Sequence, residues 1–369
     1  MTPNFQLPPY PYETLDEIRS LADRHDRGRV DLSIGTPCDP VPDVVIEALT
    51  DFESARTYPP SIGSQFFLEA VSGWLSRQLG VQLPLSSIGA CIGSKELVAG
   101  LPHILRLRSP DRDIVLYPAI SYPSYAMGAL LAGCQAVAVP INKRGELDLS
   151  TIDEAVASRS LCVWLNSPSN PTGVVSDVSK AVDWGRSRGI TVISDECYIE
   201  FVWSGKVRSI LQDGTDGILA VHSLSKRSNL AGLRAGFYTG DAELVHYLRE
   251  IRKHQGFMVP GPVQVAGTAA FNDQKHVEIQ RERYQGRLAA LVSILSVLGI
   301  SASMPDGAFY LWVPADDGDE WALVHKLATQ LGMVVAPGSF FGDQGIGYVR
   351  IAAVATDDQI DLLRERAGN

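Results

Sequence analysis

Residues 217–236 read GILAVHSLSKRSNLAGLRAG. An apolar run at 217–221 leads into a segment that carries Lys226 among serine hydroxyls, with Arg234 further along. Lysine is rarely placed at the end of a buried strand without a partner or a chemical task. The task suggested here is a Schiff base at Lys226, with Ser223, Ser225 and Arg234 binding a phosphate group beside it. A surface lysine in a serine-rich loop is the alternative interpretation.

The length and charge of the chain limit the classes of function. It has 369 residues and a formal net charge of -10 at pH 7, which suits about two domains or one large α/β unit. The negative charge argues against a nucleic acid or an anionic membrane as partner, because both bind basic surfaces. We find neither an apolar run long enough to cross a membrane nor the basic and apolar regions of a signal peptide. The expected location is the cytoplasm.

The cysteines are scattered, and they form no Cys-x-x-Cys pair or His/Cys cluster. Neither a disulfide framework nor a zinc site is expected, and we predict no metal. Most of these residues are expected to be buried, reduced thiols. They are Cys38, Cys91, Cys134, Cys162 and Cys197.

Short apolar runs alternate with amphipathic stretches over the middle of the chain. The runs are rich in Val and Ile and are bounded by polar turns, which is typical of buried strands. Such alternation predicts a mainly parallel sheet that is covered by helices on both faces. The expected strands are 114–117, 136–139, 161–165, 191–194 and 217–221, and the expected helices are 12–25, 44–52, 65–79, 96–107, 125–132, 149–157 and 176–188.

The last third of the chain predicts a second unit. A long helical region covers 241–298, and strand candidates follow at 308–313 and 348–352. We expect residues 41–275 to form a large cofactor-binding domain and 276–369 to form a small α+β domain. The N-terminal segment, 1–40, is expected to join the small domain.

Polar and aromatic groups follow four of the expected strands. Asn170 lies in an Asn-Pro-Thr-Gly turn, Asp195 and Tyr198 follow the next strand, and Tyr122 lies in an aromatic loop. Ligands of parallel sheets bind outside the carboxyl ends of the strands. A turn, a solvated carboxylate or a packing tyrosine is the simpler interpretation of each group alone. Together with Lys226, the groups indicate one site.

These groups suit a cofactor that carries an aldehyde on a pyridine ring. Lys226 would form an imine with the aldehyde, and the ring would serve as an electron sink. Asp195 would keep the ring nitrogen protonated. Asn170 and Tyr198 would hydrogen-bond the ring oxygen, and Tyr122 would stack on the ring.

A helix start offers a place for the phosphate of such a cofactor. Gly93, Ser94 and Lys95 precede the expected helix at 96–107. The first N–H groups of a helix have no partner within it and attract anions.

The order and spacing of these residues resemble the class I and II aminotransferases, which are pyridoxal-phosphate enzymes of fold type I. The lysine segment fits the attachment signature of that family, and the agreement extends from Gly35 through Asp195 to Arg350, over nearly the whole chain. The resemblance implies an α/β fold, with a mainly parallel seven-stranded sheet between helices and a small α+β domain built from both chain ends. It also implies pyridoxal 5′-phosphate as the cofactor and amino acids and 2-oxo acids as substrates.

The resemblance also implies a role for each matching residue. Lys226 would bind the cofactor and act as the base, and Asp195 and Tyr198 would complete the catalytic set. Arg350 would clamp the α-carboxylate of the substrate in bidentate fashion, unless it is an ordinary strand arginine. The substrate would contact Gly35, Asn170 and Arg350, and the cofactor would contact Gly93, Ser94, Lys95, Tyr122, Asn170, Asp195, Tyr198, Ser223, Ser225, Lys226 and Arg234.

Tyr58 matches a tyrosine that reaches the phosphate of the neighbouring subunit in this family. A homodimer with shared sites is expected from that match. The chain also departs from the family, because Leu68 stands where an arginine is usual. No second substrate-binding arginine can be identified near the N-terminus, which argues against plain aspartate as the preferred donor.

Two segments indicate a substrate. Residues 7–11 read LPPYP, and residues 117–125 read YPAISYPSY. Both look most like the actinobacterial branch that acts on N-succinyldiaminopimelate in lysine and cell-wall biosynthesis. The expected reaction moves an amino group between glutamate and N-succinyl-2-amino-6-oxopimelate by a ping-pong Schiff-base mechanism. Basic candidates for the far end of that acidic substrate are Arg24, Arg27, Lys95 and Arg227.

Other functions stay open at this point. The chain could be a broad-range aspartate or aromatic aminotransferase, or a pyridoxal-phosphate-dependent C–S lyase. A nucleotide-dependent oxidoreductase on a similar sheet is disfavoured, because no Gly-x-Gly-x-x-Gly follows a strand. A non-catalytic binding domain is disfavoured by the complete set of Lys226, Asp195 and Arg350.

Overall fold

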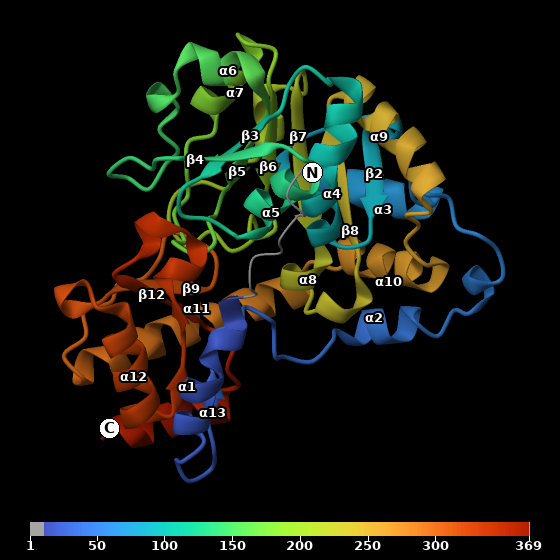
Figure 1. Cartoon of the computed structure of the whole chain (residues 1–369). Helices are drawn as coiled ribbons and strands as arrows, with labels where there is room; N and C mark the ends of the chain where they lie inside the picture. The colour runs from blue at the N-terminus through green and yellow to red at the C-terminus, as the bar shows by residue number, and fades with distance from the viewer. Residues whose placement is uncertain (1–10, 369) are drawn as a thin grey trace, which may run out of the picture.

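The computed structural model describes residues 11–368, which fold into a large part around one sheet and a smaller part beside it (Figure 1). The sheet of the large part has seven strands in the order β2-β8-β7-β6-β5-β3-β4. They are β2 (Ile88–Cys91), β3 (Ile114–Pro118), β4 (Gln135–Val139), β5 (Ser160–Asn166), β6 (Thr191–Asp195), β7 (Ile218–Ser223) and β8 (Gly236–Gly240).

Nearly all strands of this sheet run in one direction. The neighbours from β4 to β7 pair in parallel, whereas β8 is antiparallel to both β7 and β2. Strand β2 therefore runs in the same direction as β7. As a consequence, the carboxyl ends of every strand except β8 meet at the same edge of the sheet.

Alternate residues of the central strands face two different layers of helices. In β7, Ile218 and Ala220 pack in one core cluster, and Leu219 and Val221 pack in another. Because both faces are covered, the strand is apolar at successive positions rather than at alternate ones. The first layer holds α2 (Asp43–Ala48), α3 (Gln65–Trp74), α6 (Glu154–Arg159), α7 (Ser179–Arg186) and α10 (Gly261–Asn272), and the second holds α4 (Ser94–Arg108), α5 (Ser124–Leu131) and α9 (Ala242–Gln255).

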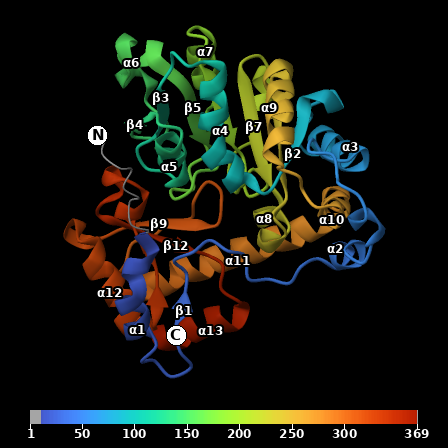
Figure 2. The same cartoon turned by 45° about the vertical axis from the view of Figure 1, so that its right-hand side comes forward.

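The smaller part is built from both ends of the chain. Strand β1 (Val30–Asp31) pairs in parallel with β10 (Met333–Val334). A second sheet has the antiparallel order β11-β12-β9, formed by Ala336–Pro337, Tyr348–Ala352 and Tyr310–Pro314. The helices around them are α1 (Asp16–Ala22), α11 (Lys275–Val297), α12 (Glu320–Leu331) and α13 (Asp357–Ala367). Figure 2 shows these elements grouped below the large sheet, with α11 extending from one part to the other.

The expected α/β architecture is confirmed, including the mainly parallel sheet and the small unit that both chain ends share. The five expected strands of the large sheet are each found within two residues of their predicted ends. The domain boundaries at 40/41 and 275/276 stay predictions. Residues 1–10, which include most of the LPPYP segment, lie outside the described part.

Several expected helices differ in the structure. The helix expected at 12–25 is α-helical only over α1, the one expected at 44–52 ends at Ala48, and the one expected at 176–188 begins at Ser179. The helical region 241–298 is divided, because Gly256, at φ 73°, ends α9, and residues 273–274 separate α10 from α11. The helix expected at 149–157 begins only at Glu154, because the Asp153 side chain accepts from the Val156 N–H at 2.8 Å and caps it. The helix expected at 65–79 is α-helical only to Trp74 and continues as a π-helical turn.

Among residues 11–368, no helix is long and apolar enough to span a membrane.

The central strand β7 generates a stability prediction. Leu219→Ala should lower the free energy of unfolding by about 2–5 kcal/mol, because Leu219 is fully buried and truncation leaves a cavity between β7 and the second helix layer. Leu131→Ala is the matched control, since Leu131 is 55% exposed and its loss should cost about 0.5 kcal/mol or less. Urea denaturation measures both; equal effects would contradict the assignment of Leu219 to the core.

Candidate active site

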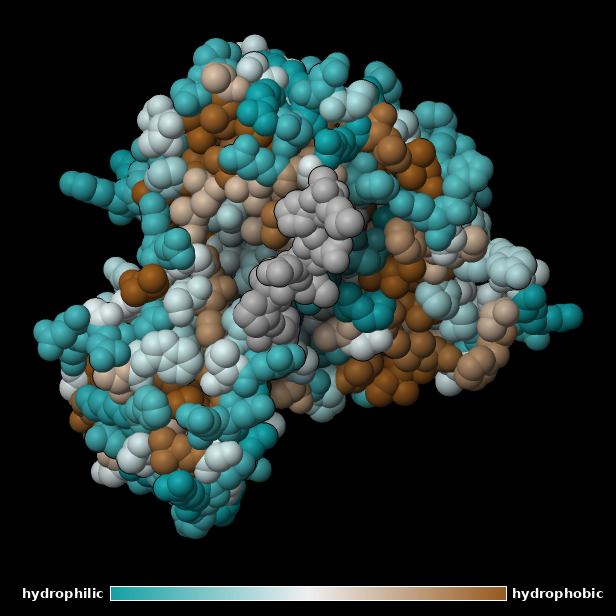
Figure 3. Space-filling model, in the orientation of Figure 1, coloured by the Kyte–Doolittle hydropathy of each residue, from teal (hydrophilic) through white to brown (hydrophobic). Residues whose placement is uncertain are grey.

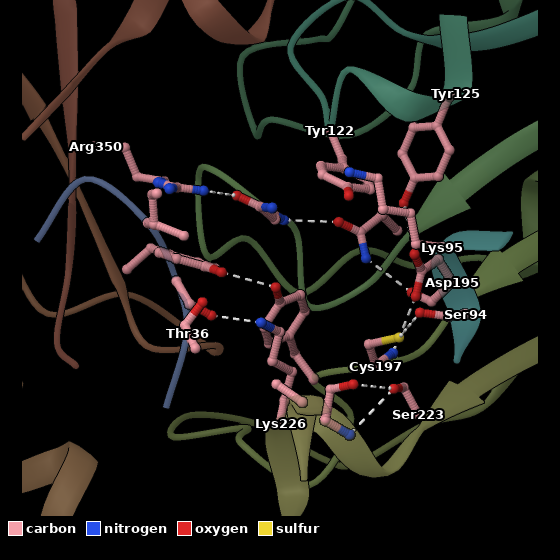
Figure 4. Close-up of a pocket in the computed structure, with 18 of the residues that line it drawn as sticks. Thr36, Ser94, Lys95, Tyr122, Tyr125, Asp195, Cys197, Ser223, Lys226 and Arg350 are labelled. Carbon is pink, nitrogen blue, oxygen red and sulfur yellow. Dashed lines mark hydrogen bonds between the residues drawn. The ribbon is translucent and has the colours of Figure 1, made fainter. Parts of the chain in front are cut away.

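A cavity of about 270 Å³ lies at the carboxyl edge of the large sheet, against the smaller part. The structure brings twelve of the fourteen predicted site residues to it: Gly35, Ser94, Lys95, Tyr122, Asn170, Asp195, Tyr198, Ser223, Ser225, Lys226, Arg234 and Arg350. The lining also contains eight residues that the sequence did not identify: Tyr12, Ile34, Thr36, Tyr125, Asn166, Cys197, Ala231 and Tyr310. Figure 4 shows the polar groups of this cavity pointing toward one another from several strands.

Lys226 lies in a one-turn helix, α8 (Leu224–Arg227), directly after β7. The Ser223 hydroxyl accepts from the Ser225 N–H at 3.1 Å and starts this turn, so the chain folds back and Lys226 faces the cavity. The Lys226 Nζ donates to the Gly35 carbonyl. Burial lowers the pKa of Lys226 to about 8, and the nearby charges of Cys197 and Asp195 oppose that effect. A substantial fraction of this amine is thus neutral and nucleophilic near neutral pH.

Asp195, at the end of β6, is held by two donors. The Tyr125 hydroxyl donates to Oδ2 at 3.0 Å, and the Cys197 N–H donates to Oδ1 at 3.2 Å. Burial raises the pKa of Asp195, while these hydrogen bonds and the charge of Lys226 lower it. Within residues 11–368 the carboxylate has no ion-pair partner. A cation placed against it would therefore be strongly favoured.

Arg350 reaches the cavity from β12 of the smaller part. It is buried between aromatic rings, with its guanidinium 4.5 Å from the Tyr310 centroid and 4.6 Å from that of Phe341. Its Nη1 donates to Asn170 Oδ1 at 2.7 Å, and its Nη2 donates to Tyr12 Oη at 3.3 Å and to a backbone carbonyl. Its Nε has no partner in the described chain. Arg350 thus retains hydrogen-bonding capacity for a bound acid.

Asn166 holds the turn that contains Asn170 through hydrogen bonds. Asn166 donates from Nδ2 to the Asp195 carbonyl at 2.8 Å and accepts from the Asn170 N–H at 2.7 Å. Because Arg350 donates to Oδ1 of Asn170, the amide is oriented with Nδ2 free to donate into the cavity.

The start of α4 offers groups that suit an anion. No side chain caps this helix, and Ser94 and Lys95 provide its first N–H groups. The hydroxyls of Ser223 and Ser225 lie 2.9 Å from each other on the same side of the cavity. Arg234 lies beside these groups, with its backbone in the left-handed region at φ 55°, a conformation that is uncommon for residues other than glycine.

Gly93 does not line the cavity, but it makes this arrangement possible. Its φ is 72°, and a Cβ built on it would lie 2.3 Å from the Arg234 Nη2. A side chain at this position would therefore displace the arginine from the helix start.

Tyr122 forms an aromatic wall of the cavity. Its ring contacts Tyr125 edge to face at 5.9 Å, and the Lys95 ammonium lies 6.0 Å from its centroid. Tyr125 in turn stacks on the buried Trp164 at 5.0 Å. The wall is anchored in the core, which fixes the position of the Tyr122 ring.

Tyr58 is not brought to this cavity. It is 93% exposed and lies in a shallow surface groove with Arg249 and Lys253. Of the four basic residues considered for the far end of a substrate, only Lys95 lines the cavity. Arg227 is buried in an ion pair with Glu200, and Arg27 pairs with Glu365 on the surface.

Two of the residues that the sequence did not identify carried a usable signal. Asn166 is the last residue of β5 and Cys197 lies two residues after β6, so their places at strand ends resemble those of Asn170 and Asp195. Tyr12 and Tyr310 carried none, because only tertiary packing brings them to the cavity: Tyr12 packs on Phe340, and Tyr310 lies in β9 beside β12.

Comparisons with known proteins support the same interpretation. A family model described as aminotransferase class I and II matches residues 27–366. The 4-dedimethylamino-4-oxo-anhydrotetracycline transaminase OxyQ of Streptomyces rimosus is 41% identical over 98% of this chain and 99% of its own length. An LL-diaminopimelate aminotransferase of Aquifex aeolicus is 34% identical over 98% of this chain and 97% of its own.

Solved structures agree in fold. Substrate-bound BacF of Bacillus subtilis superposes with a TM-score of 0.90 at 27% identity, covering 99% of this chain and 97% of that one. A probable N-succinyldiaminopimelate aminotransferase of Thermus thermophilus gives a TM-score of 0.85 at 29% identity, covering 97% and 99%.

The lowered pKa of Lys226 predicts a pH dependence. The neutral amine should be half formed near pH 8, whereas an ordinary lysine is about 1% neutral or less at that pH. Trinitrophenylation of the ligand-free protein by trinitrobenzenesulfonate, whose reactive form does not titrate in this range, followed by peptide mass spectrometry, should give a rate at Lys226 that rises up to about pH 8 and then levels off. The exposed Lys143 in the same digests is the internal control; a Lys226 rate that still rises about tenfold between pH 8.5 and 9.5 would contradict the assignment.

Proposed function

Since the chain belongs to the aminotransferase class I and II family, whose members of this fold depend on pyridoxal 5′-phosphate, we propose that it transfers an amino group between glutamate and N-succinyl-2-amino-6-oxopimelate. The observation that carries the proposal is the convergence of Lys226, Asp195 and Arg350 on one cavity. Each of the three supplies a group that this transfer needs: an amine, a carboxylate and a guanidinium.

The residues of the cavity fit pyridoxal 5′-phosphate. The cofactor supplies an aldehyde that joins amines covalently and a ring that accepts electrons. The phosphate would bind the start of α4, the two serine hydroxyls and Arg234. Asp195, which lacks a cationic partner among the described residues, would hold the proton of the ring nitrogen. Asn170 and Tyr198 would donate to the ring oxygen, and Tyr122 would lie against the ring.

The chain's own groups would then direct the reaction. Lys226 would hold the cofactor and, once released, would take and return the proton at the substrate carbon that bears nitrogen. A pKa of about 8 suits that exchange, because a general base works best when its pKa lies near the working pH. Arg350 would bind the α-carboxylate and so orient that carbon toward Lys226.

Among the described residues, Lys95 is the candidate partner for the acidic far end of the proposed substrate. Lys95 lines the cavity, and its ammonium lies over Tyr122. The diaminopimelate enzymes among the similar proteins, by their names, act on long amino acids with a second polar end. They support an acceptor of this type, in lysine biosynthesis.

A second candidate is a polycyclic ketone. The 41% identity to OxyQ, whose name specifies a 4-oxo-anhydrotetracycline, favours this alternative. An aspartate or aromatic aminotransferase and a C–S lyase remain the other choices. Release of pyruvate and ammonia would identify the lyase.

We also propose that the enzyme is a cytoplasmic homodimer with shared sites. The exposed Tyr58 would reach the phosphate of a second copy. Exposed apolar side chains support such an interface: Val44, Ile46 and Phe52 are 40–72% exposed. Figure 3 shows hydrophobic surface gathered over α2 and α10, on the same side of the molecule.

Replacing Lys226 tests the covalent role. Lys226→Ala should lower transamination by more than about 10⁴-fold, since both covalent attachment and proton transfer are lost. Pyridoxal phosphate should still bind, but reversibly, through the phosphate site. Spectra before and after dialysis and the rate of 2-oxoglutarate formation measure both effects. Lys143→Ala is the control and should behave as wild type; near-normal transamination by Lys226→Ala would end the proposal.

A substrate comparison tests the specificity. With glutamate as donor, kcat/KM should be highest for N-succinyl-2-amino-6-oxopimelate among that acid, phenylpyruvate, oxaloacetate and a 4-oxo-tetracycline. Lys95→Gln should lower kcat/KM for the succinylated acid by about 10–100-fold, the effect of one charged hydrogen bond, and leave phenylpyruvate unchanged. Arg24→Gln, at an exposed site outside the cavity, is the control. A clear preference for another acceptor would replace the proposed substrate.

A further inference from the structure

Two buried tyrosines from different parts of the fold meet beside the cavity. Tyr198 follows β6 of the large sheet, and Tyr310 is the first residue of β9 in the smaller part. Their hydroxyl oxygens lie 2.7 Å apart, and the rings pack edge to face at 5.5 Å. Only one of the two protons can lie between the oxygens, so the direction of this hydrogen bond decides where the other proton points.

The surroundings set the direction. Burial raises the pKa of both phenols, that of Tyr310 to about 12 and that of Tyr198 well above its ordinary value. The Arg350 guanidinium, 4.5 Å from the Tyr310 centroid, lowers the pKa of Tyr310 against the effect of burial and lowers the pKa of Tyr198 less. Tyr310 is therefore the more acidic phenol and the better donor.

We propose that Tyr310 is a positioning residue that donates its proton to the Tyr198 oxygen and so leaves the Tyr198 proton to point at the ring oxygen of the cofactor. This inference rests on the proposed function. A donor that itself accepts a hydrogen bond becomes a stronger donor. Tyr310 thus strengthens the hydrogen bond from Tyr198 to the ring oxygen without contacting that oxygen.

The backbone of Gly35 also packs closely against the Tyr310 hydroxyl. A Cβ built on Gly35 would lie only 2.2 Å from the Tyr310 Oη. The reason for glycine at position 35 is the lack of a side chain, because its φ is not in the left-handed region. The hydroxyl therefore has the Gly35 backbone and the Tyr198 hydroxyl as close neighbours.

The register of the small sheet fixes Tyr310 relative to the substrate arginine. In the β9–β12 pair, Tyr310 lies opposite Ala352, and Arg350 lies opposite Trp312. Tyr310 and Arg350 are thus diagonal neighbours on one face, as the stacking of the guanidinium on the ring requires. The group that would bind the substrate carboxylate and the group that orients Tyr198 belong to one rigid pair of strands.

The inference predicts a spectroscopic shift. A hydrogen bond from Tyr198 stabilises the anionic ring oxygen, so weakening it should move the proton loss of the bound cofactor to higher pH. In the protein loaded with pyridoxal phosphate, Tyr310→Phe should raise the pH midpoint of the visible absorbance change by about 0.3–0.7 unit. Tyr198→Phe should raise it by about 1 unit or more.

A double variant separates this effect from general damage. Tyr198→Phe/Tyr310→Phe should titrate like Tyr198→Phe alone, because Tyr310 acts only through Tyr198. Tyr284→Phe is the matched control: Tyr284 is fully buried in the same core cluster, its hydroxyl has no partner among the described residues, and it does not line the cavity. Its midpoint should equal that of wild type.

The outcomes distinguish the inference from the function on which it rests. An unchanged midpoint in Tyr310→Phe, or shifts that add in the double variant, would overturn the role of Tyr310 and leave the aminotransferase proposal intact. A wild-type protein that gains no visible band with pyridoxal phosphate would overturn both.

Discussion

The direction of the strands in the large sheet is the constraint on which the site depends. Because β2, β3, β5, β6 and β7 run the same way, their carboxyl ends deliver the α4 start, the aromatic loop, the Asn170 turn, Asp195 and Lys226 to one edge. Parallel strands need both faces covered, and the alternating clusters of β7 show that they are. The edge is the only place where such strands can present polar groups without disturbing the core.

In the short helix α8, a residue of the candidate site is followed directly by a residue of the core. Successive residues of a helix point about 100° apart, so Lys226 faces the cavity while Arg227 enters the core. Arg227 binds Glu200 and donates to the Ala270 carbonyl at 2.8 Å. A buried pair of this kind adds little net stability, but breaking it leaves an uncompensated charge. It therefore anchors the turn that carries Lys226.

The sequence indicated the parallel sheet, because apolar runs bounded by turns are a local pattern. It did not indicate β2 and β8, which contain glycines where other strands have branched residues. The glycines have a tertiary cause: a Cβ at Gly236 would lie 2.4 Å from the His222 carbonyl, and one at Gly89 would lie 2.3 Å from the Tyr238 ring. The close approach of two strands cannot be inferred from the residues that neighbour a glycine in the sequence.

Some residues of the candidate site can likewise be predicted from local sequence, and others cannot. Residues at strand ends, such as Asp195, could be predicted, because the end of a strand and the type of the residue there can both be read from the neighbouring sequence. The sequence predicts Arg227 wrongly as a substrate residue, because its charge can be read from the sequence and its orientation into the core cannot. Tyr12 and Tyr310 depend on tertiary packing within the smaller part: the Tyr12 ring packs on Phe340 at 5.3 Å, and Tyr310 lies in β9, which pairs with β12.

That pairing has a consequence for coupling between the two parts of the molecule. The smaller part contacts Asn170 through Arg350 and Tyr198 through Tyr310. Both donors sit on adjacent strands in fixed register. A rotation that moved β12 away from Asn170 would separate Tyr310 from Tyr198 at the same time. A rigid movement of this strand pair would therefore affect both residues that are predicted to contact the ring oxygen.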